Sequence, residues 1–293
     1  MVVAVRLQGG LGNQLFQYAA ARHLAQAHGT TLALDVTSLA GRLVSAGSGQ
    51  PQRQFELNAL RTKGAIWRLP TKPLATRIGI KVSERLPSRL APWFGVFREH
   101  HFHFSRTFFN LPSDIYLIGY FQSERYFSAV AETIREELQP CDERLLHQAQ
   151  LDIARVRRPD RCLVSVHLRR TDYLAAAATG QVHGLGDDYY GPAMARFGPN
   201  VDFLVFSDDL AWCRNNMRGD NIFYCSTGRA VDDLLRMSLC DHHIIANSTF
   251  SWWAAWLDRK ASKIVIAPRR WFGPASPHYN DTADLLPPDW IVL

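Results

Sequence analysis

The chain has 293 residues, of which 47% are hydrophobic and 20% are charged. This composition excludes disordered, collagenous and coiled-coil proteins, and no stretch approaches the ~20 uninterrupted apolar residues of a membrane span. The 33 basic and 27 acidic side chains give a net charge of +6, which suits an anionic ligand. No long run of basic residues is present, so the sequence argues against a nucleic-acid-binding tail.

The first residues predict a β-α-β unit. An apolar run at 2–7 ends at Gly9-Gly10-Leu11-Gly12, and a helical pattern then begins at Asn13 and stops at Gly29. A second buried strand is expected at 31–35. The N-terminus lacks a basic segment followed by a long apolar one, so we expect no signal peptide and a cytoplasmic protein.

The middle of the chain is poorly patterned. Residues 37–113 are rich in Gly, Pro, Ser and Arg, and we expect loops and short helices there. A strand is expected at 115–120 and a helix at 128–138. The polar stretch at 155–161 is the expected domain boundary.

Apolar runs and helical patterns alternate in the second half. The expected strands lie at 163–168, 203–206, 222–224, 244–246 and 264–267. The expected helices lie near 189–197, 211–217, 231–240 and 250–258. Such alternation predicts a parallel sheet covered by helices. The expected fold class is therefore α/β, with two Rossmann-like domains, residues 1–155 and 156–293, facing a cleft.

The glycine-rich turn is the first candidate site. Gly10 and Gly12 would let the backbone approach a ligand, and the helix that follows offers free N–H groups and a partial positive charge. The segment is neither a dinucleotide fingerprint, which would need glycine where Leu15 stands, nor a P-loop. The alternative is a simple tight turn in which Asn13 caps the helix.

The segment from His167 to Tyr173 is a stronger candidate, because it directly follows a predicted strand. His167 and Arg169 would share one face of the strand, and an arginine at the carboxyl end of a parallel strand fits phosphate. The alternative is an Arg–Asp ion pair beside a buried histidine. We favour the ligand site, because two arginines and an aspartate are costly to arrange at a strand end without a charged ligand.

Two further strand ends are polar. Asp208 and Asp209 could bind a metal or accept bonds from a ribose or a base, although they do not form a DxD motif; helix capping is the alternative. Asn247, Ser248, Thr249 and Phe250 open a helix whose hydroxyl and N–H groups could cradle phosphate. Trp252 and Trp253 behind them are expected in the core. We expect His100, His101 and His103 to be structural.

Taken together, these segments resemble the bacterial α-1,2-fucosyltransferases of glycosyltransferase family 11. The resemblance rests on GGLGNQLFQYAAARHLA (9–25), GYFQSERYF (119–127), VHLRRTDY (166–173), FSDD (206–209) and MSLCDHHIIANSTFSWWAAWL (237–257). Ala254 stands where glycine is common in the family, and Arg236 replaces an apolar residue. The resemblance implies a GT-B fold with the active site between two Rossmann-like domains. It also implies inverting transfer of fucose from GDP-β-L-fucose to the 2-hydroxyl of a terminal β-galactoside.

The resemblance also suggests roles for the residues. Loss of GDP develops negative charge that fixed cations must neutralise, so Arg169 is assigned to the β-phosphate. Arg170 would assist it or hold the loop, and His167 would orient the arginine or touch the diphosphate. The remaining donor contacts are assigned to Asp208 and Asp209 on ribose or guanine, to Asn247, Ser248, Thr249 and Phe250 on the phosphates, and to Gly10, Gly12 and Asn13 from the other domain.

Asp172 is nominated as the general base, and Asp35 is the competing candidate. Asp172 lies beside the arginines, and Asp35 ends the second predicted strand. No metal or other cofactor is expected, GDP-fucose being a co-substrate, and no nucleic-acid partner. Fucosyl transfer with another linkage and a non-catalytic sugar-nucleotide or glycan binding module are the alternatives. A lipid-linked acceptor with peripheral membrane contact is compatible with the resemblance.

Overall fold

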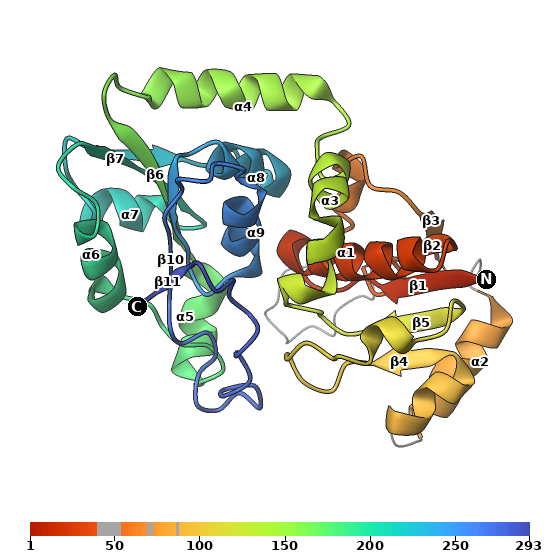
Figure 1. The fold of residues 1–293 in the computed structure, drawn as a ribbon. Helices are drawn as coiled ribbons and strands as arrows, with labels where there is room; N and C mark the ends of the chain where they lie inside the picture. Colours follow the sequence, from red (N-terminus) through yellow and green to blue (C-terminus); the bar gives the residue numbers. More distant parts are fainter. Residues whose placement is uncertain (40–53, 69–72, 86–87) are drawn as a thin grey trace. The chain divides into compact units, whose positions relative to one another are not determined.

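The computed structural model describes residues 1–39, 54–68, 73–85 and 88–293 (Figure 1). The chain forms two compact units, each built on its own sheet. Unit 1 comprises Met1–Cys141 and Ala283–Leu285, and unit 2 comprises Asp142–Thr282 and Leu286–Leu293. Both sheets are parallel and flanked by helices, so the predicted α/β class with two Rossmann-like units is confirmed. No helix in the described parts of the chain is long and apolar enough to cross a membrane.

Unit 1 has a five-stranded sheet in the order β3-β2-β1-β5-β4. Its strands are β1 (Val2–Arg6), β2 (Thr31–Asp35), β3 (Ala65–Trp67), β4 (Val96–Arg98) and β5 (Ile115–Ile118). Its α-helices are α1 (Leu11–Ala27), α2 (Leu74–Ser83) and α3 (Ala131–Glu137). Short 3-10 helices lie at Leu57–Ala59, Ser88–Phe94, Phe108–Asn110, Glu124–Tyr126 and Ser128–Val130. The predicted β-α-β unit is confirmed, and the poorly patterned region contains β3, α2 and β4.

Helix α1 is buried on most of its surface because small side chains let it lie close to the sheet. Ala19, Ala20 and Ala21 have no exposed surface. Gln17 is equally buried, but its amide bonds both Gln8 N (3.0 Å) and Gly119 O (3.1 Å). A buried polar group satisfied in this way avoids the desolvation penalty and ties the helix to the ends of β1 and β5.

Unit 1 includes a segment from near the end of the chain. Asp284 accepts a hydrogen bond from the backbone N–H of Phe104 (3.0 Å) and forms an ion pair with Arg125 (2.6 Å). Residues 283–285 therefore anchor a loop that lies almost two hundred positions earlier in the sequence.

Unit 2 has a six-stranded sheet in the order β11-β10-β9-β6-β7-β8. Its strands are β6 (Cys162–Leu168), β7 (Val201–Ser207), β8 (Ile222–Cys225), β9 (His242–Ile244), β10 (Val265–Ala267) and β11 (Ile291–Val292). Its helices are α4 (Glu143–Val156), α5 (Thr171–Ala178), α6 (Asp187–Ala195), α7 (Leu210–Asn216), α8 (Ala230–Ser238) and α9 (Thr249–Leu257). Numbered from β6, this is the doubly wound order in which direction reverses between the first and fourth strands.

The unit boundary lies before α4, whereas the sequence placed it at 155/156, near the end of that helix. Helix α4 packs on α8, where the guanidinium of Arg236 is almost fully buried and binds Asp152 at 2.5 Å. Because the contact joins α4 to α8, the helix belongs to unit 2.

Helix α9 fills the centre of unit 2 with aromatic rings. Trp252 and Trp253 have no exposed surface, and their rings pack at 5.2 Å between centroids. Trp256 stacks on Trp252 at 6.2 Å. The expectation that the tryptophan pair is core is confirmed.

Candidate functional site

The principal candidate site lies at the switch point of the unit 2 sheet. Strand β6 has β7 on one side and β9 on the other, so the loops that leave the carboxyl ends of these three strands diverge and leave a crevice. A cavity of about 470 Å³ occupies this position. Its lining includes His167, Arg169, Asp208, Ser226 and Phe250.

Arg169 is held by two carboxylates at the cavity. Its Nε and Nη2 donate to Asp172 Oδ1 (2.8 Å) and Oδ2 (2.9 Å), and its Nε lies 3.2 Å from Asp208 Oδ2. Burial by itself would lower the pKa of Arg169, but the bond to Asp172 and the two negative charges raise it. The side chain keeps 26% of its surface exposed. Arg169 is thus a fixed cation with a face toward the cavity.

His167 is buried and uncharged beside Arg169. Burial, together with the positive charge of Arg169, lowers the pKa of His167 to about 3. Its Nδ1 is buried without a hydrogen-bond partner, although its ring lines the cavity and contacts the ring of Phe250 at 5.5 Å. The alternative drawn from the sequence, an ion pair beside a buried histidine, describes this geometry correctly. An orphaned nitrogen in a cavity wall nevertheless points to a ligand.

The Arg170 side chain contacts other residues than the Arg169 side chain does. Its guanidinium lies 3.5 Å from the centre of the Trp212 ring, and its Nε is 3.5 Å from Asp209 Oδ2. Its backbone N–H donates to Asp208 Oδ1 (2.9 Å). Of the two expected roles for Arg170, holding the loop is the one that these contacts match.

The two aspartates after β7 organise the turn. Asp208 Oδ2 accepts from Thr171 Oγ1 (2.6 Å), and Asp209 Oδ1 accepts from Trp212 N (3.0 Å) at the start of α7. The capping alternative is therefore correct for Asp209. Binding of ribose or guanine by either carboxylate is untested and stays a prediction.

In the segment after β9, Asn247 and Ser248 bond to the protein itself, whereas Thr249 and Phe250 are partly exposed. Asn247 Nδ2 donates to His183 O (2.8 Å) and Trp271 O (2.9 Å), which fixes the loop. Ser248 caps α9, and its Oγ accepts from Phe250 N (3.4 Å). Thr249 and Phe250 are half-buried, and Phe250 lines the cavity.

In unit 1 the glycine turn also joins a strand to a helix at a switch point, here between β1 and β5. Helix α1 begins at Leu11 with Gly10 as its N-cap, and no side chain caps it, so the alternative in which Asn13 caps the helix is wrong. Asn13 Oδ1 instead accepts from Gln122 Nε2 (3.0 Å). The left-handed residue of the turn is Gly9 (φ +78°), not Gly10 or Gly12.

Both candidates for the general base are bound by the protein. Asp172 meets Arg169 with both oxygens. Asp35 is buried and accepts from the Tyr116 hydroxyl and from Thr37 N (3.0 Å). These contacts match positioning roles better than proton transfer.

Several residues at the unit 2 cavity escaped the sequence analysis. Ser226 and Gly228 follow β8, and Asp233 lies in the first turn of α8. Asp233 accepts from Thr227 N (2.9 Å) and Oγ1 (3.0 Å), while burial raises its pKa. The Ser-Thr-Gly run at the end of a predicted strand was the available signal. Among the described residues, no group of three or more His, Cys, Asp or Glu side chains is arranged to hold a metal ion.

The chain matches a known family and several proteins of known name. The model for glycosyl transferase family 11 matches residues 2–293. The O-antigen biosynthesis glycosyltransferase WbnK of Escherichia coli is 31% identical and covers 98% of this chain and 99% of its own. An alpha-1,2-colitosyltransferase of the same organism is 29% identical with 92% of each chain covered. The galactoside alpha-(1,2)-fucosyltransferase 1 of Bos taurus is 28% identical over 85% of this chain and 64% of its own.

Solved structures that match this chain include fucosyltransferases. NodZ alpha-1,6-fucosyltransferase soaked with GDP-fucose has a TM-score of 0.48 at 15% identity, and covers 87% of this chain and 92% of its own. POFUT1 in complex with GDP has a TM-score of 0.49 at 12% identity, and covers 90% of this chain and 97% of its own.

Proposed function

We propose that this chain, which belongs to glycosyl transferase family 11, transfers L-fucose from GDP-β-L-fucose to the 2-hydroxyl of a terminal β-galactoside. The observation that carries the proposal is the fixed guanidinium of Arg169 beside the orphaned nitrogen of His167, both at the unit 2 cavity. A cavity of about 470 Å³ is of the size that small-molecule ligands occupy, roughly 300–1,000 Å³.

The donor diphosphate would lie against Arg169. In the transfer, the acceptor oxygen forms a bond to the anomeric carbon and the bond from that carbon to the β-phosphate oxygen breaks. Its electron pair leaves with GDP, the acceptor hydroxyl gives up its proton to solvent or to the departing diphosphate, and the configuration at the anomeric carbon inverts. Negative charge therefore grows on the β-phosphate, where a preformed cation stabilises the transition state more than the ground state.

The partners of Arg169 support this role. Asp172 contacts it with both oxygens, which fixes the plane of the guanidinium before the substrate binds. We therefore assign Asp172 as a positioning residue rather than as the general base. His167, neutral at physiological pH, would offer Nδ1 to the same diphosphate.

The glycine turn of unit 1 is a proposed ligand contact of that unit. We propose that Asn13, with the backbone of Gly10 and Gly12, can bind a sugar-phosphate group at the start of α1. The partial positive charge of the helix N-terminus supports this assignment, as does the position of the turn at the carboxyl edge of the sheet.

The names of the relatives support the sugar and the linkage. Two of the three relatives described above are named for α-1,2 transfer, one of fucose and one of colitose. We propose fucose as the donor sugar and the galactose 2-hydroxyl as the acceptor. A higher rate with GDP-colitose than with GDP-fucose would correct the sugar and leave the site assignment intact.

The testing experiment mixes the purified protein with GDP-fucose, a β-galactosyl disaccharide and EDTA. We expect GDP release coupled to a product that bears fucose on the galactose 2-hydroxyl, at a rate that EDTA does not change, because arginine supplies the neutralising charge. A folded protein that releases no GDP with any galactoside would refute the proposal. Activity that requires added Mg²⁺ or Mn²⁺ would refute the metal-independent mechanism and direct attention to Asp208 and Asp209.

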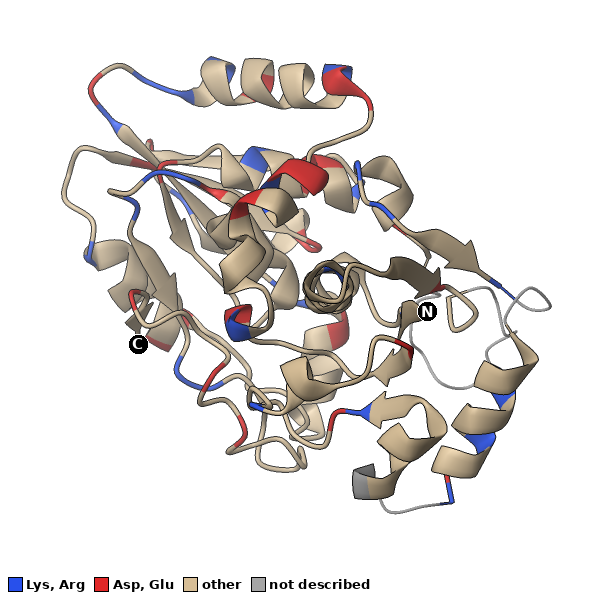
Figure 2. Cartoon of the chain, turned by 45° about the vertical axis from the view of Figure 1, so that its right-hand side comes forward, with Lys and Arg blue, Asp and Glu red and all other residues tan. Residues whose placement is uncertain are grey.

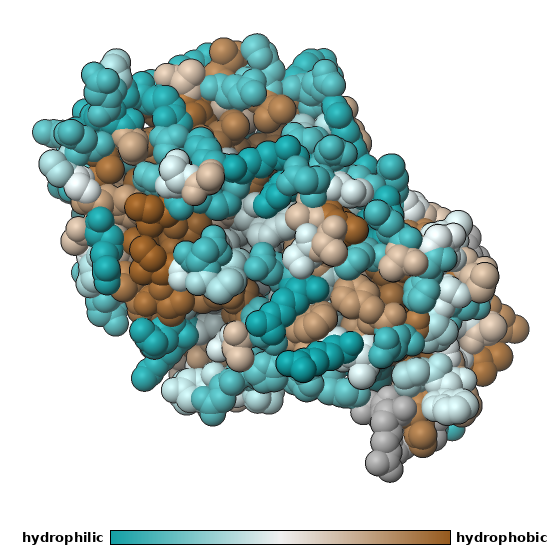
Figure 3. All heavy atoms as spheres, in the orientation of Figure 1, coloured by the Kyte–Doolittle hydropathy of each residue, from teal (hydrophilic) through white to brown (hydrophobic). Residues whose placement is uncertain are grey.

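We further propose that unit 1 makes peripheral contact with anionic membranes through α2 and the 3-10 helix that follows it. Leu74, Ile78 and Trp93 are exposed there, and Trp93 has 85% of its surface free. Arg77 and Lys81 add positive charge to the same helix (Figure 2), and hydrophobic residues gather over α2 in the space-filling view (Figure 3). Apolar and basic side chains on one amphipathic helix suit an anionic lipid surface.

The membrane proposal is tested by sedimentation with lipid vesicles. We expect binding to vesicles rich in phosphatidylglycerol, weaker binding to phosphatidylcholine alone, and a loss of binding in Trp93→Ala. Equal binding to both lipids would remove the electrostatic part of the proposal, and no binding to either would remove the proposal itself.

A further inference from the structure

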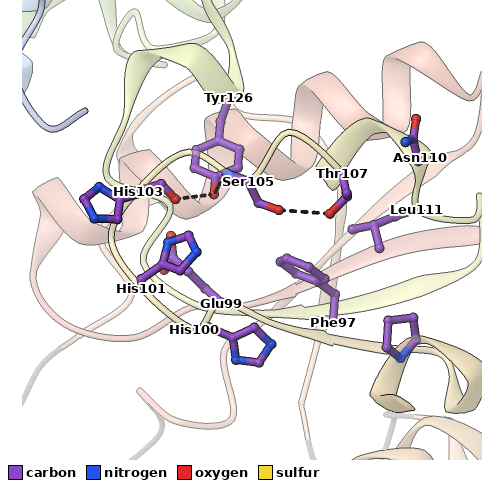
Figure 4. Close-up of a pocket in the computed structure, with 11 residues that line it drawn as sticks. Phe97, Glu99, His100, His101, His103, Ser105, Thr107, Asn110, Leu111 and Tyr126 are labelled. Atoms are coloured by element: carbon purple, nitrogen blue, oxygen red, sulfur yellow. Dashed lines mark hydrogen bonds between the residues drawn. The ribbon is translucent and has the colours of Figure 1, made fainter. Parts of the chain in front are cut away.

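A second cavity lies in unit 1, outside the residues assigned to the donor. It also has a volume of about 470 Å³ and lies beside the loop that leaves the carboxyl end of β4 (Figure 4). His100, His101 and His103 of this loop contribute to its wall. These histidines were expected to be structural, yet two of them are exposed.

The wall of this cavity combines an apolar surface with polar side chains. Phe97 and Leu111 are largely buried and contribute the apolar surface of the lining, whereas the ring of Tyr126 has no exposed surface. Around them are the imidazoles, the hydroxyls of Ser105 and Thr107, and the amide of Asn110 (Figure 4). The two hydroxyls are 3.1 Å apart, and the His101 and His103 rings are 5.2 Å apart, so the polar groups are closely spaced.

The charge of this wall differs from that of the unit 2 cavity. None of the described residues that line it is Lys or Arg. Its carboxylate, Glu99, accepts from the backbone N–H groups of Tyr120 (2.6 Å) and Phe121 (3.0 Å). Burial lowers the pKa of His100, and the neighbouring His101 adds to this effect, so His100 is neutral near pH 7.

These groups match a neutral polyhydroxylated ligand. A neutral imidazole has one donor and one acceptor nitrogen, and hydroxyl and amide groups also do both. Sugar hydroxyls donate and accept as well, while the C–H faces of a pyranose ring are apolar and suit an aromatic surface. A nucleotide or a phosphate would instead need fixed cations, and the described residues of the lining supply none.

We propose that this cavity binds the acceptor glycan as a neutral saccharide, with its C–H face toward Phe97 and its hydroxyls on the imidazoles and on Asn110. The inference rests on the proposed function and specifies where its acceptor binds. The cavity lies at the carboxyl end of β4, and this is the edge at which parallel sheets bind ligands.

The experiment uses two exposed cavity residues and one matched control. His101→Ala removes an imidazole, Asn110→Trp fills the cavity, and His28→Ala removes an exposed histidine of the same unit outside the cavity. We expect His101→Ala to raise the KM for a β-galactosyl disaccharide about tenfold, as for loss of one or two neutral hydrogen bonds. Asn110→Trp should abolish transfer. In both variants, affinity for GDP-fucose and GDP release without acceptor should equal the wild-type values, and His28→Ala should be unchanged throughout.

The outcomes separate this inference from the proposed function. Wild-type transfer with an unchanged acceptor KM in both cavity variants would overturn the cavity assignment and leave the transferase intact. If the wild type releases no GDP, saccharide binding is still measurable from the histidine ring resonances during titration with the disaccharide. Shifts that Asn110→Trp abolishes would support the cavity without turnover, and the absence of shifts in the wild type would overturn it.

Discussion

Replacement of Arg169 by alanine tests the proposed chemistry most directly. At a separation of ~4 Å and an effective dielectric constant of about 20, which suits a partly exposed group, a guanidinium and a full negative charge attract by about 4 kcal/mol. The neighbouring carboxylates of Asp172 and Asp208 offset part of this attraction. We therefore expect Arg169→Ala to lower kcat by about a hundred- to a thousandfold, the range for loss of one preorganised donor.

The assay measures GDP release and fucosylated product, with thermal unfolding as the check on folding. The Arg169 and Asp172 side chains are about a quarter exposed, so the loss of this partly buried pair should also lower the melting temperature, and kcat is compared only below that temperature. Arg144→Ala is the matched control, because Arg144 also meets an aspartate, Asp142, through Nε and Nη2 (2.8–3.1 Å) but on the open surface of α4. A folded Arg169→Ala enzyme that keeps more than about a tenth of wild-type kcat would refute the reasoning.

Three further predictions address neighbouring features. If Asp172 only positions the guanidinium, Asp172→Asn should lower kcat while the acidic limb of the pH–rate profile stays; disappearance of that limb would identify it as the base instead. Because the folded-state pKa of His167 is depressed to about 3, its contribution to stability is full above pH ~6.5 and declines as the pH falls toward 3, at about 1.4 kcal/mol per unit. As the pH is lowered from 6.5 to 5, the free energy of unfolding in urea should therefore fall by about 2 kcal/mol less for His167→Gln than for the wild type. Equal decreases in the two proteins would contradict this. Gly9→Ala should destabilise the protein more than Gly29→Ala: both glycines have positive φ, but a Cβ at Gly9 would overlap the Asn13 amide, whereas the space at Gly29 is open. Equal melting temperatures would show that the overlap is relieved.

The sequence was most informative where strands are buried on both faces. Strands β6 and β7 are seven residues long and mostly apolar, so their runs stand out. Strands β3 and β4 have only three residues each, and β3 lies at the sheet edge with exposed side chains, so neither produces a run. Helix α4 was missed because its pattern is largely polar and its buried contact depends on Arg236, a residue that hydropathy counts as surface.

The sequence predicted those parts of the candidate site whose residues lie close together in the chain. The strand-end rule identified His167 and Arg169, because both follow from where β6 stops. The partner of Arg170 could not be found in this way, since Trp212 lies in another helix and meets the arginine only after folding. The cavity beside His101 was missed because an irregular loop has no period to interpret.

The anchoring of the Phe104 loop by Asp284 has a consequence for the order of events during synthesis. The two residues are 180 positions apart, and contacts of such separation form late because the closing segment must first exist. On the ribosome, the strands of unit 1 emerge and can pair long before residue 284 is made. We therefore expect the loop that contains His103 to reach its final position only after most of unit 2 has been translated, so that a nascent chain completes the cavity beside this loop last.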